Sequence, residues 1–305
     1  MVDPEFGGIY WAVDYQGNVT DSRKHVYAQA FAIYALSEYY RVTANADALN
    51  LANRLYQLIE KIGFFPERNA YGEEFNREWQ EQPNEQLSEN GVIADITMNT
   101  HLHVLEAYTN LYRVQPSEEL RDRMVNLLTI FHEKIYDPTT HVLGVFFNTS
   151  WESLVDLTSY GHDIEASWLL DEAIHVLGLK NEAFNQMVMN IAYNIARHAV
   201  QPDGSLANEK EGDHLDLTKV WWVQVEAMVG FVNAFRHTKD EIFQERTLAL
   251  WAYTKKHLID PREGGEWYWS AEPNGEPTQR NIGGPWKAAY HNSRFCMEIM
   301  ERVTK

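Results

Sequence analysis

The most constraining feature of the sequence is a turn-forming segment that recurs along the chain. Residues 3–11 are DPEFGGIYW, and residues 260–269 repeat the pattern as DPREGGEWYW. Weaker copies begin near positions 66, 137 and 202. Proline and glycine end a preceding helix, and the aromatic run after them favours a short strand or hairpin. The recurrence therefore predicts a chain built from copies of one unit of roughly sixty residues.

Each turn segment is followed by sequence with helical periodicity, and the helices fall into two sets. Those rich in Ala, Leu, Tyr and Trp are expected to be buried inner helices, at 24–42, 99–114, 162–177, 218–236 and 290–304. Those with scattered charges are expected to be outer helices, at 47–62, 118–135, 181–199 and 240–258. A ring of six inner–outer pairs would need three more helices. We therefore expect a chain without its N-terminal helices, or an open arc.

Composition limits the partners that the protein can have. The chain has 305 residues, 45% of them hydrophobic, which suits one large or two ordinary domains. A net charge of −18 argues against nucleic acid and anionic membrane surfaces as partners. No run of about 20 apolar residues is present, so no membrane span is expected. The single cysteine, Cys296, fits a reducing compartment, and we expect a cytoplasmic protein.

The segment 161–172, GHDIEASWLLDE, carries a candidate acid–base pair. His162 and Glu165 are three residues apart at the start of an expected helix, so their side chains share a face. In isolation this pattern is more often a capped helix with a surface ion pair. The other inner helices, however, also begin with polar or aromatic groups, namely Tyr27; Asn99, His103 and Glu106; Trp222 and Glu226; and Trp286 with His291.

Parallel inner helices would bring these groups to one rim of the fold. His101 and His103 are two apart, so only one of them can face the centre. A tryptophan on an inner helix is usually part of the core, and a single histidine is usually a satisfied polar group. That all these groups meet at one rim by chance is less probable than that they form a functional site. Helix N-termini at that rim would favour a developing negative charge such as an enediolate.

Common metal and nucleotide motifs are absent from the sequence. It contains no H-E-x-x-H, no C-x-x-C, no calcium loop, no G-x-G-x-x-G and no P-loop. We expect neither a metal nor a nucleotide cofactor.

Five strings carry a resemblance to a known family. They are NTHLHVLEAYTN at 99–110, GHDIEASW at 161–168, EGDH at 211–214, KVWWVQVEA at 219–227 and HNSR at 291–294. With these strings the chain resembles the N-acylglucosamine 2-epimerase superfamily over essentially its whole length. The resemblance implies an all-α fold, an (α/α)6 barrel. Residues 1–305 would form one catalytic domain with about nine of twelve helices and short β-hairpins at the seams. It would lack the N-terminal helices, one of which bears a sugar-holding arginine in the family.

The resemblance also implies an activity and a site. The branch of the family that it matches inverts C2 of the reducing-end glucose in β-1,4-disaccharides such as cellobiose and lactose, with no metal or nicotinamide. The partner would be the disaccharide, and the protein a monomer or weak dimer. The implied catalytic residues are His162, His291 and His103. The implied substrate-binding residues are Tyr27, Asn99, Glu165, Trp168, Trp222, Glu226 and Trp286.

Other activities remain open at this point. Within the family, the chain could be a mannose isomerase or an N-acylglucosamine 2-epimerase. An (α/α)6 glycoside hydrolase would use two carboxylates, such as Glu165 and Glu226, and would cleave the disaccharide. A non-catalytic sugar-binding fragment would bind without turnover. Products formed from cellobiose, mannose and N-acetylglucosamine separate these alternatives.

Overall fold

The computed structural model describes residues 1–85 and 91–304, in which nine α-helices alternate with strands of two or three residues. The chain divides into two compact units, which are described separately. Unit 1 comprises Met1–Tyr136, Gly144–Val155 and Glu172–Lys180, and unit 2 comprises Asp137–Leu143, Asp156–Asp171 and Asn181–Lys305.

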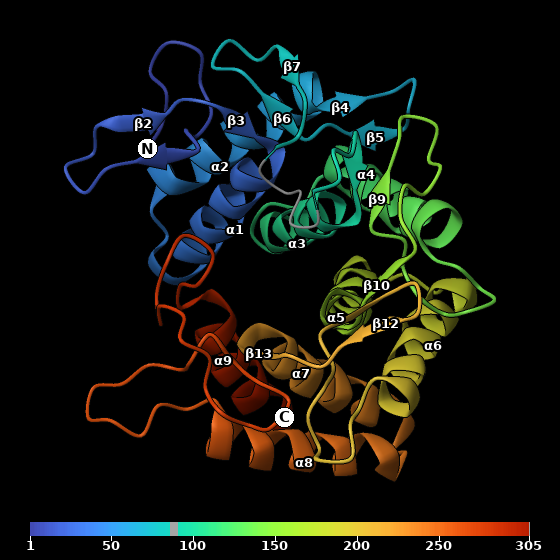
Figure 1. The fold of residues 1–305 in the computed structure, drawn as a ribbon. Helices are drawn as coiled ribbons and strands as arrows, with labels where there is room; N and C mark the ends of the chain where they lie inside the picture. The colour runs from blue at the N-terminus through green and yellow to red at the C-terminus, as the bar shows by residue number, and fades with distance from the viewer. Residues whose placement is uncertain (86–90, 305) are drawn as a thin grey trace. The chain divides into compact units, whose positions relative to one another are not determined.

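Unit 1 contains two helical hairpins. Its helices are α1 (Val26–Thr43), α2 (Ala46–Leu58), α3 (Met98–Val114) and α4 (Glu118–Ile130). Helix α1 packs against both α2 and α3, and α3 packs against α4 (Figure 1). Helix α3 is buried over nearly all of its length, whereas α4 buries one face and begins with the acidic pair that follows Ser117. The predicted inner and outer helices of these hairpins are confirmed.

Unit 2 holds the remaining helices. They are α6 (Glu182–His198), α7 (Trp221–Thr238), α8 (Glu241–His257) and α9 (Tyr290–Thr304), together with the first part of α5 (Tyr160–Leu177). Helix α7 packs against α6, α8 and α9 and is buried on most sides. The prediction that α9 is a buried inner helix is only partly right. Its buried residues are Arg294 and Phe295, and Met300 is exposed.

Short antiparallel strands lead into the inner helices. Those of unit 1 are β1 (Ala12–Val13), β2 (Val19–Asp21), β3 (Lys24–His25), β4 (Phe64–Phe65), β5 (Ala70–Tyr71), β6 (Glu74–Phe75), β7 (Glu81–Gln82), β8 (Ile96–Thr97) and β9 (Phe146–Phe147). Those of unit 2 are β10 (Leu157–Ser159), β11 (Glu209–Glu211), β12 (His214–Asp216), β13 (Lys219–Val220) and β14 (Ser270–Ala271). Strands β3, β8, β10 and β13 end one residue before α1, α3, α5 and α7 begin.

These strands correct two of the predicted helix starts. Residues Lys24 and Lys219 were expected to be helical or next to the first helical turn, but each is paired in a ladder. Lys24 pairs with Phe75 and Lys219 with Ala271. Ladder pairing holds these residues in an extended conformation, so α1 begins two residues, and α7 three residues, after its predicted start.

The recurring turn segment is closed in the same way in each unit. Isolated antiparallel bridges join Val2 to Ile9 in unit 1, and Ile259 to Trp267 in unit 2. Gly7 has φ 71° in the first copy and Gly264 has φ 70° in the second, a region that glycine adopts readily. In both copies the carboxylate of the leading aspartate accepts the backbone N–H two residues later. The repeat found in the sequence is therefore a structural repeat.

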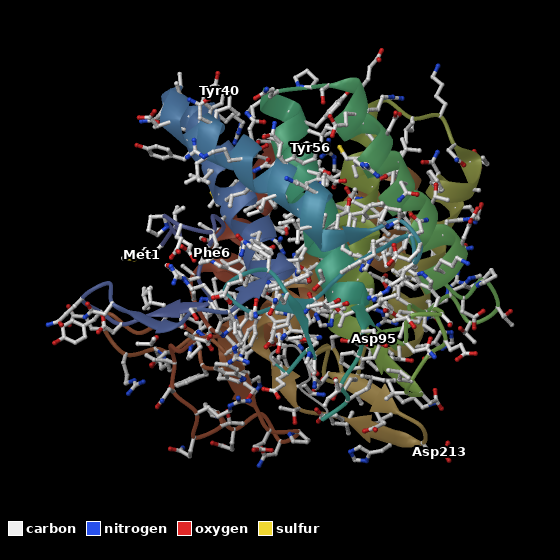
Figure 2. All side chains as sticks on the ribbon, turned by 90° about the horizontal axis from the view of Figure 1, so that it is seen from above. Met1, Phe6, Tyr40, Tyr56, Asp95 and Asp213 are labelled. Carbon is white, nitrogen blue, oxygen red and sulfur yellow. The ribbon has the colours of Figure 1, made fainter. Side chains whose placement is uncertain are left out.

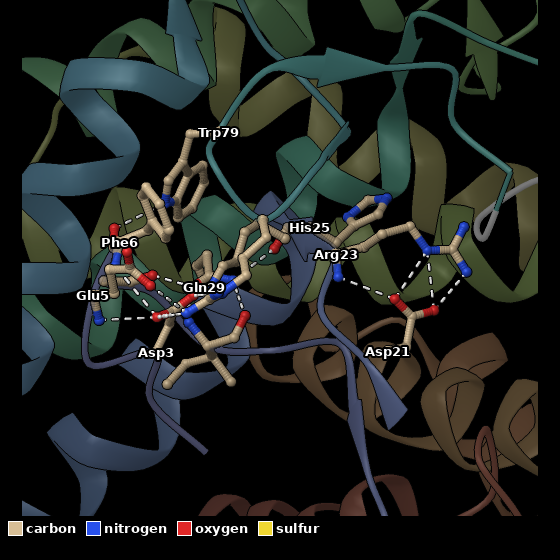
Figure 3. A network of polar contacts seen from close by, with 12 residues as sticks. Asp3, Glu5, Phe6, Asp21, Arg23, His25, Gln29 and Trp79 are labelled. Carbon is tan, nitrogen blue, oxygen red and sulfur yellow. Dashed lines mark hydrogen bonds and ion pairs between the residues drawn. The ribbon is translucent and has the colours of Figure 1, made fainter. Parts of the chain in front are cut away.

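A buried ionic network fixes the first turn segment to β3, the strand that leads into α1 (Figure 3). Asp3 accepts hydrogen bonds from the Lys24 ammonium at 3.0 Å and from Arg77 Nε at 3.0 Å. Burial raises the pKa of Asp3, but Arg77, the backbone N–H groups and Lys24 outweigh it and hold that pKa well below its usual range. Arg23, close to the same network, pairs with Asp21 and Glu74. These ion pairs give Arg23 a structural use.

The direction of helices α1 and α3 positions the candidate residues of unit 1. Tyr40, near the C-terminal end of α1, lies at the opposite end of the helices from Asp95, which precedes β8 and α3 (Figure 2). Helices α1 and α3 therefore begin at the same end of unit 1.

The predicted outer helices 47–62 and 118–135 each end in a π-helical turn, Ile59–Gly63 and Phe131–Ile135. No helix in the described residues has the length and apolarity needed to cross a membrane.

Candidate active site

In unit 1 the candidate residues lie on the first turns of α1 and α3. The Nδ1 atom of His103 is 2.8 Å from a carboxylate oxygen of Glu106, one turn further along α3. The edge of the Tyr27 ring meets the His103 ring with centroids 5.2 Å apart, and Phe31 lies 4.8 Å away on the same helix as Tyr27. The imidazole of His103 is thus held by one carboxylate and two aromatic rings.

Asn99 lies one turn before His103 on α3. Its Oδ1 atom is buried and has no hydrogen-bond partner among the described residues. A buried amide oxygen without a donor is costly, because it has lost water and gained nothing in return. The position next to His103 makes this oxygen a candidate acceptor for a sugar hydroxyl.

The other histidine of the same helix is structural. His101 Nε2 accepts the backbone N–H of Tyr71 at 3.0 Å, and its Nδ1 is 2.8 Å from the carbonyl oxygen of Thr97. Burial lowers the pKa of His101 to about 4, so the ring is neutral near pH 7. The choice of His103 over His101 as the residue that faces the site agrees with these contacts.

In unit 2 the centre of the candidate site is the buried carboxylate of Glu226 on α7. Its Oε1 atom accepts hydrogen bonds from His291 Nδ1 at 2.7 Å and from Arg294 Nη2 at 2.6 Å. Its Oε2 atom accepts the indole N–H of Trp168 at 3.1 Å. Arg294 Nη2 also donates to Glu165 Oε1 at 2.6 Å. One arginine therefore bridges two carboxylates from α5 and α7.

The charge state of Glu226 follows from these partners. Burial raises the pKa of Glu226, but the charge of Arg294 and the hydrogen bond from His291 outweigh it and lower that pKa to about 2. The carboxylate is ionised at neutral pH and can only accept hydrogen bonds. His291 must therefore carry its hydrogen on Nδ1 in the neutral form. The lone pair is then on Nε2, which is the nitrogen able to take a proton from a substrate.

His162 is held differently. Its Nδ1 atom is 2.8 Å from the hydroxyl oxygen of Ser159, the last residue of β10. Its ring lies against the indole of Trp222, with centroids 4.7 Å apart, and the ring of His291 lies 5.5 Å from the same indole. The two candidate histidines of unit 2 thus contact the same tryptophan.

Several predicted site residues of unit 2 lie behind this arrangement. The side chains of Glu165 and Glu226 are each 1% exposed, and Trp168 is also buried. Their contacts include Arg294, His291 and one another, so in this structure they support the site from behind. Trp286 is 40% exposed, and the next residue, the buried Lys287, pairs with the partly exposed Glu266.

Sequence reasoning missed Arg294 as a site residue. The guanidinium lies 4.2 Å from the centroid of the Tyr290 ring and 4.8 Å from that of Trp168, in addition to its two carboxylate bonds. The signal was present, because Arg294 closes the HNSR string three residues after His291 and must therefore share a helix face with it. Ser159, which precedes the GHDIE segment, was also missed as a candidate site residue.

A cation could be held by the same groups only in place of the guanidinium. Ligand atoms of Glu165, Glu226 and His291 lie within 4.8 Å of one another. Arg294 Nη2 already occupies the position between the two carboxylates, and it satisfies the same oxygens that a metal ion would need. The donor set therefore fits an arginine clamp better than a metal site.

The predicted residues thus form two groups. Tyr27, Asn99 and His103 lie near helix starts in unit 1. In unit 2 one connected set is formed by Glu165, Trp168, Trp222, Glu226, His162 and His291. That all of them meet at one rim, and that the chain forms a single domain, stay predictions.

Comparisons with known proteins show which family the chain resembles. The model of the N-acylglucosamine 2-epimerase family matches residues 1–294. A cellobiose 2-epimerase of Ruminococcus albus is 46% identical over 305 residues, covering 99% of the chain and 77% of that relative. The solved structure of cellobiose 2-epimerase from Bacillus thermoamylovorans B4167 matches with TM-score 0.97 at 61% identity, covering 99% of the chain and 78% of that structure. A D-mannose isomerase of Marinomonas mediterranea is 22% identical over 326 residues, covering 98% of the chain and 76% of that relative.

The helical hairpins and these matches define an epimerase with an (α/α)6 barrel fold, so the predicted fold class is confirmed. The chain belongs to the N-acylglucosamine 2-epimerase family. The comparisons do not confirm that N-terminal helices are missing, and that statement stays a prediction.

Proposed function

We propose that the protein inverts C2 of the reducing-end glucose in β-1,4-linked disaccharides such as cellobiose and lactose, with His162 and His291 transferring the protons. The relatives at 46% and 61% identity are both cellobiose 2-epimerases, whereas the D-mannose isomerase is only 22% identical. A disaccharide is therefore the substrate that similarity favours.

The observation that carries the proposal is the pair of imidazoles beside Trp222. Each is bonded at Nδ1, His162 to Ser159 and His291 to Glu226, and their ring centroids lie 4.7 and 5.5 Å from the same indole. An apolar sugar face stacks well on an indole. A sugar bound at Trp222 would therefore lie beside both histidines.

Such a pair suits inversion at a carbon next to a carbonyl. In the open-chain sugar, a neutral imidazole takes the C2 proton, and the electron pair of the C–H bond forms the C1–C2 double bond of an enediolate. As this double bond forms, the π pair of the C1 carbonyl moves onto its oxygen. The other imidazole, protonated, then delivers a proton to the opposite face of C2. The C1–C2 π pair forms the new C–H bond, and the pair on oxygen re-forms the carbonyl. One histidine begins neutral and the other protonated, and they exchange roles in the reverse direction. A single base combined with rotation about the C2–C3 bond is the alternative.

The helix starts favour the anionic intermediate. His162, Trp222 and His291 lie in the first turns of α5, α7 and α9. Unpaired N–H groups give a helix N-terminus a partial positive charge, which stabilises a nearby anion. We assign no single oxyanion donor, because this effect is shared among the three helix starts.

The carboxylate pair argues against glycoside hydrolysis. A glycosidase needs one carboxylic acid that is protonated at working pH, and hence a raised pKa. Glu226 instead has a pKa lowered to about 2, and both it and Glu165 accept from Arg294. Neither carboxylate has the surroundings of a general acid.

The remaining residues receive supporting roles in the proposal. His103 would assist ring opening, and Tyr27 and Asn99 would bind hydroxyl groups. Trp286, being partly exposed, would stack on a sugar ring. A cytoplasmic location and a monomeric or weakly dimeric state stay predictions.

The test follows deuterium at C2 during incubation with cellobiose in D2O. We expect His162→Ala and His291→Ala each to stop formation of the mannose epimer and to reduce exchange at C2 by at least about 100-fold, the lower bound typical of a general base. His198→Ala, an exposed histidine at the end of α6, is the matched control and should leave both unchanged. Exchange retained in both site variants would remove these histidines from the mechanism. Parallel incubations with mannose and N-acetylglucosamine decide between the activities of the family.

A further inference from the structure

We propose that Ser159 is a positioning residue that sets the orientation and the tautomer of His162. The inference rests on the proposed function of His162 and adds a residue to which no role has been given. Ser159 is buried, and its hydroxyl oxygen lies 2.8 Å from His162 Nδ1.

The hydroxyl of Ser159 is itself held in place by the fold. Ser159 is the last residue of β10, which pairs antiparallel with β11, so its backbone is fixed opposite Glu209. The chain passes from this strand into α5 at Tyr160, and His162 follows in the first turn. A serine just before a helix commonly uses its oxygen to cap backbone N–H groups. Here the oxygen is also within hydrogen-bond distance of a side chain that the proposed chemistry needs.

The bond suits a histidine that transfers protons through Nε2. If Nδ1 keeps its hydrogen, the serine oxygen accepts it both when the imidazole is neutral and when it is protonated. The same hydrogen bond therefore persists through the cycle. His291 has an ionised carboxylate at the equivalent nitrogen, so the two histidines are supported in chemically different ways. The hydroxyl orients His162 without adding a charge beside it.

Trp222, the second contact of the His162 ring, is held by a close approach that depends on Gly161. A Cβ atom at Gly161 would lie 2.6 Å from the far edge of the Trp222 ring and 2.7 Å from a methyl group of Val223. Only glycine lets Trp222 come this near to the start of α5. With Ser159 on one nitrogen and Trp222 against the ring, a small rotation of the imidazole would disturb both contacts.

The experiment compares Ser159→Ala and Ser159→Thr with Ser167→Ala. Ser167 serves as the matched control. It is a buried serine on α5, the helix of His162, and its hydroxyl donates to the carbonyl oxygen of Ile164 at 2.7 Å. We expect Ser159→Ala to lower kcat on cellobiose about 10- to 100-fold, as is typical when the partner of a working histidine is removed. KM should change little. Ser159→Thr keeps the hydroxyl and should recover most of kcat.

A second measurement does not depend on activity. Long-range hydrogen–nitrogen NMR correlations of His162 should show hydrogen on Nδ1 in the wild type and a mixture of tautomers in Ser159→Ala. A merely structural serine would lower the melting temperature and leave the tautomer unchanged, which would overturn the proposal. A loss of kcat below twofold in Ser159→Ala would also overturn it. If the wild type forms no epimer, the proposed function fails while the tautomer still tests Ser159. If Ser159→Ala does not fold, Ser159→Cys, a weaker hydrogen-bonding partner, takes its place in both measurements.

Discussion

Replacing Arg294 with methionine tests the electrostatic account of the site most directly. The substitution keeps a long flexible side chain against the rings of Trp168 and Tyr290 but removes the charge that bridges two buried carboxylates. Glu165 and Glu226 would then face each other with no cation between them. Arg294→Met therefore separates the contribution of charge from that of packing.

The size of the effect follows from the pKa of Glu226. Its value of about 2, compared with 4.5 for an ordinary glutamate, corresponds to about 3 kcal/mol in favour of the ionised form. Removing one partner of a buried ion pair usually costs about 3–5 kcal/mol, because the remaining charge is left without compensation. We expect the free energy of unfolding at pH 7 to fall by an amount in this range.

The sign of the pH dependence should change as well. In the wild type the lowered pKa of Glu226 gives stability that is present above pH 4.5 and is lost as the pH falls towards 2. In Arg294→Met burial acts without the arginine and raises that pKa above its ordinary value. The carboxyl then contributes stability at low pH that is lost as the pH rises through the new pKa.

Urea unfolding at several pH values measures both effects. The matched control is Arg302→Met, because Arg302 also lies on α9 and over the Trp168 ring, at 5.5 Å. Its ion pair is with Glu298, one turn away on the same helix, and it donates to Asn233 Oδ1 at 2.8 Å. That variant leaves no fully buried carboxylate without its cation, so it should lose less stability than Arg294→Met. The reasoning is refuted if Arg294→Met loses no more than Arg302→Met, or if its stability still falls on acidification between pH 4.5 and 2 as in the wild type.

Two further predictions concern buried neighbours of the site. His101→Gln keeps a donor and an acceptor but removes a histidine whose pKa is lowered to about 4. In the wild type this lowered pKa contributes about 3 kcal/mol to the free energy of unfolding above pH 6.5. That contribution is lost as the pH falls towards 4. Unfolding curves of this variant should depend less on pH in that window, and an unchanged slope would contradict the neutral buried histidine. Gly161→Ala should displace Trp222, cost about 1–3 kcal/mol as overpacking does, and shift the tryptophan fluorescence. Wild-type emission and melting temperature would show that the approach at Gly161 is not tight.

The sequence predicted the helices well because each hairpin repeats one pattern. The outer helix expected at 181–199 is α6, Glu182–His198, and the one expected at 240–258 is α8, Glu241–His257. Capping residues mark these starts, and a 3.6-residue apolar period marks their lengths. The helix starts at Lys24 and Thr218 were placed too early because two-residue strands pair across long stretches of sequence. No local pattern reveals such a pairing.

Most of the candidate residues could be chosen from the sequence, but the contacts between them could not. Histidines and tryptophans at helix starts are visible in the sequence, so His162, Trp222 and His291 could be chosen. That Glu226 would bond to His291 depends on contacts between α7 and α9 that spacing along one helix cannot show. Arg294 was missed for the same reason, since its partners are 68 and 129 residues away.

The shared oxygen of Glu226 has a consequence for how the protein would lose function on heating. His291 and Arg294 both come from α9, one turn apart, and both bond to Oε1 of Glu226 on α7. A slide of α9 along its axis would break the two bonds together, so no intermediate position keeps the ion pair while releasing the imidazole. Detachment of this last helix and failure of proton transfer are therefore a single event, and inactivation should begin at the C-terminal end of the chain before the hairpins of unit 1 unfold.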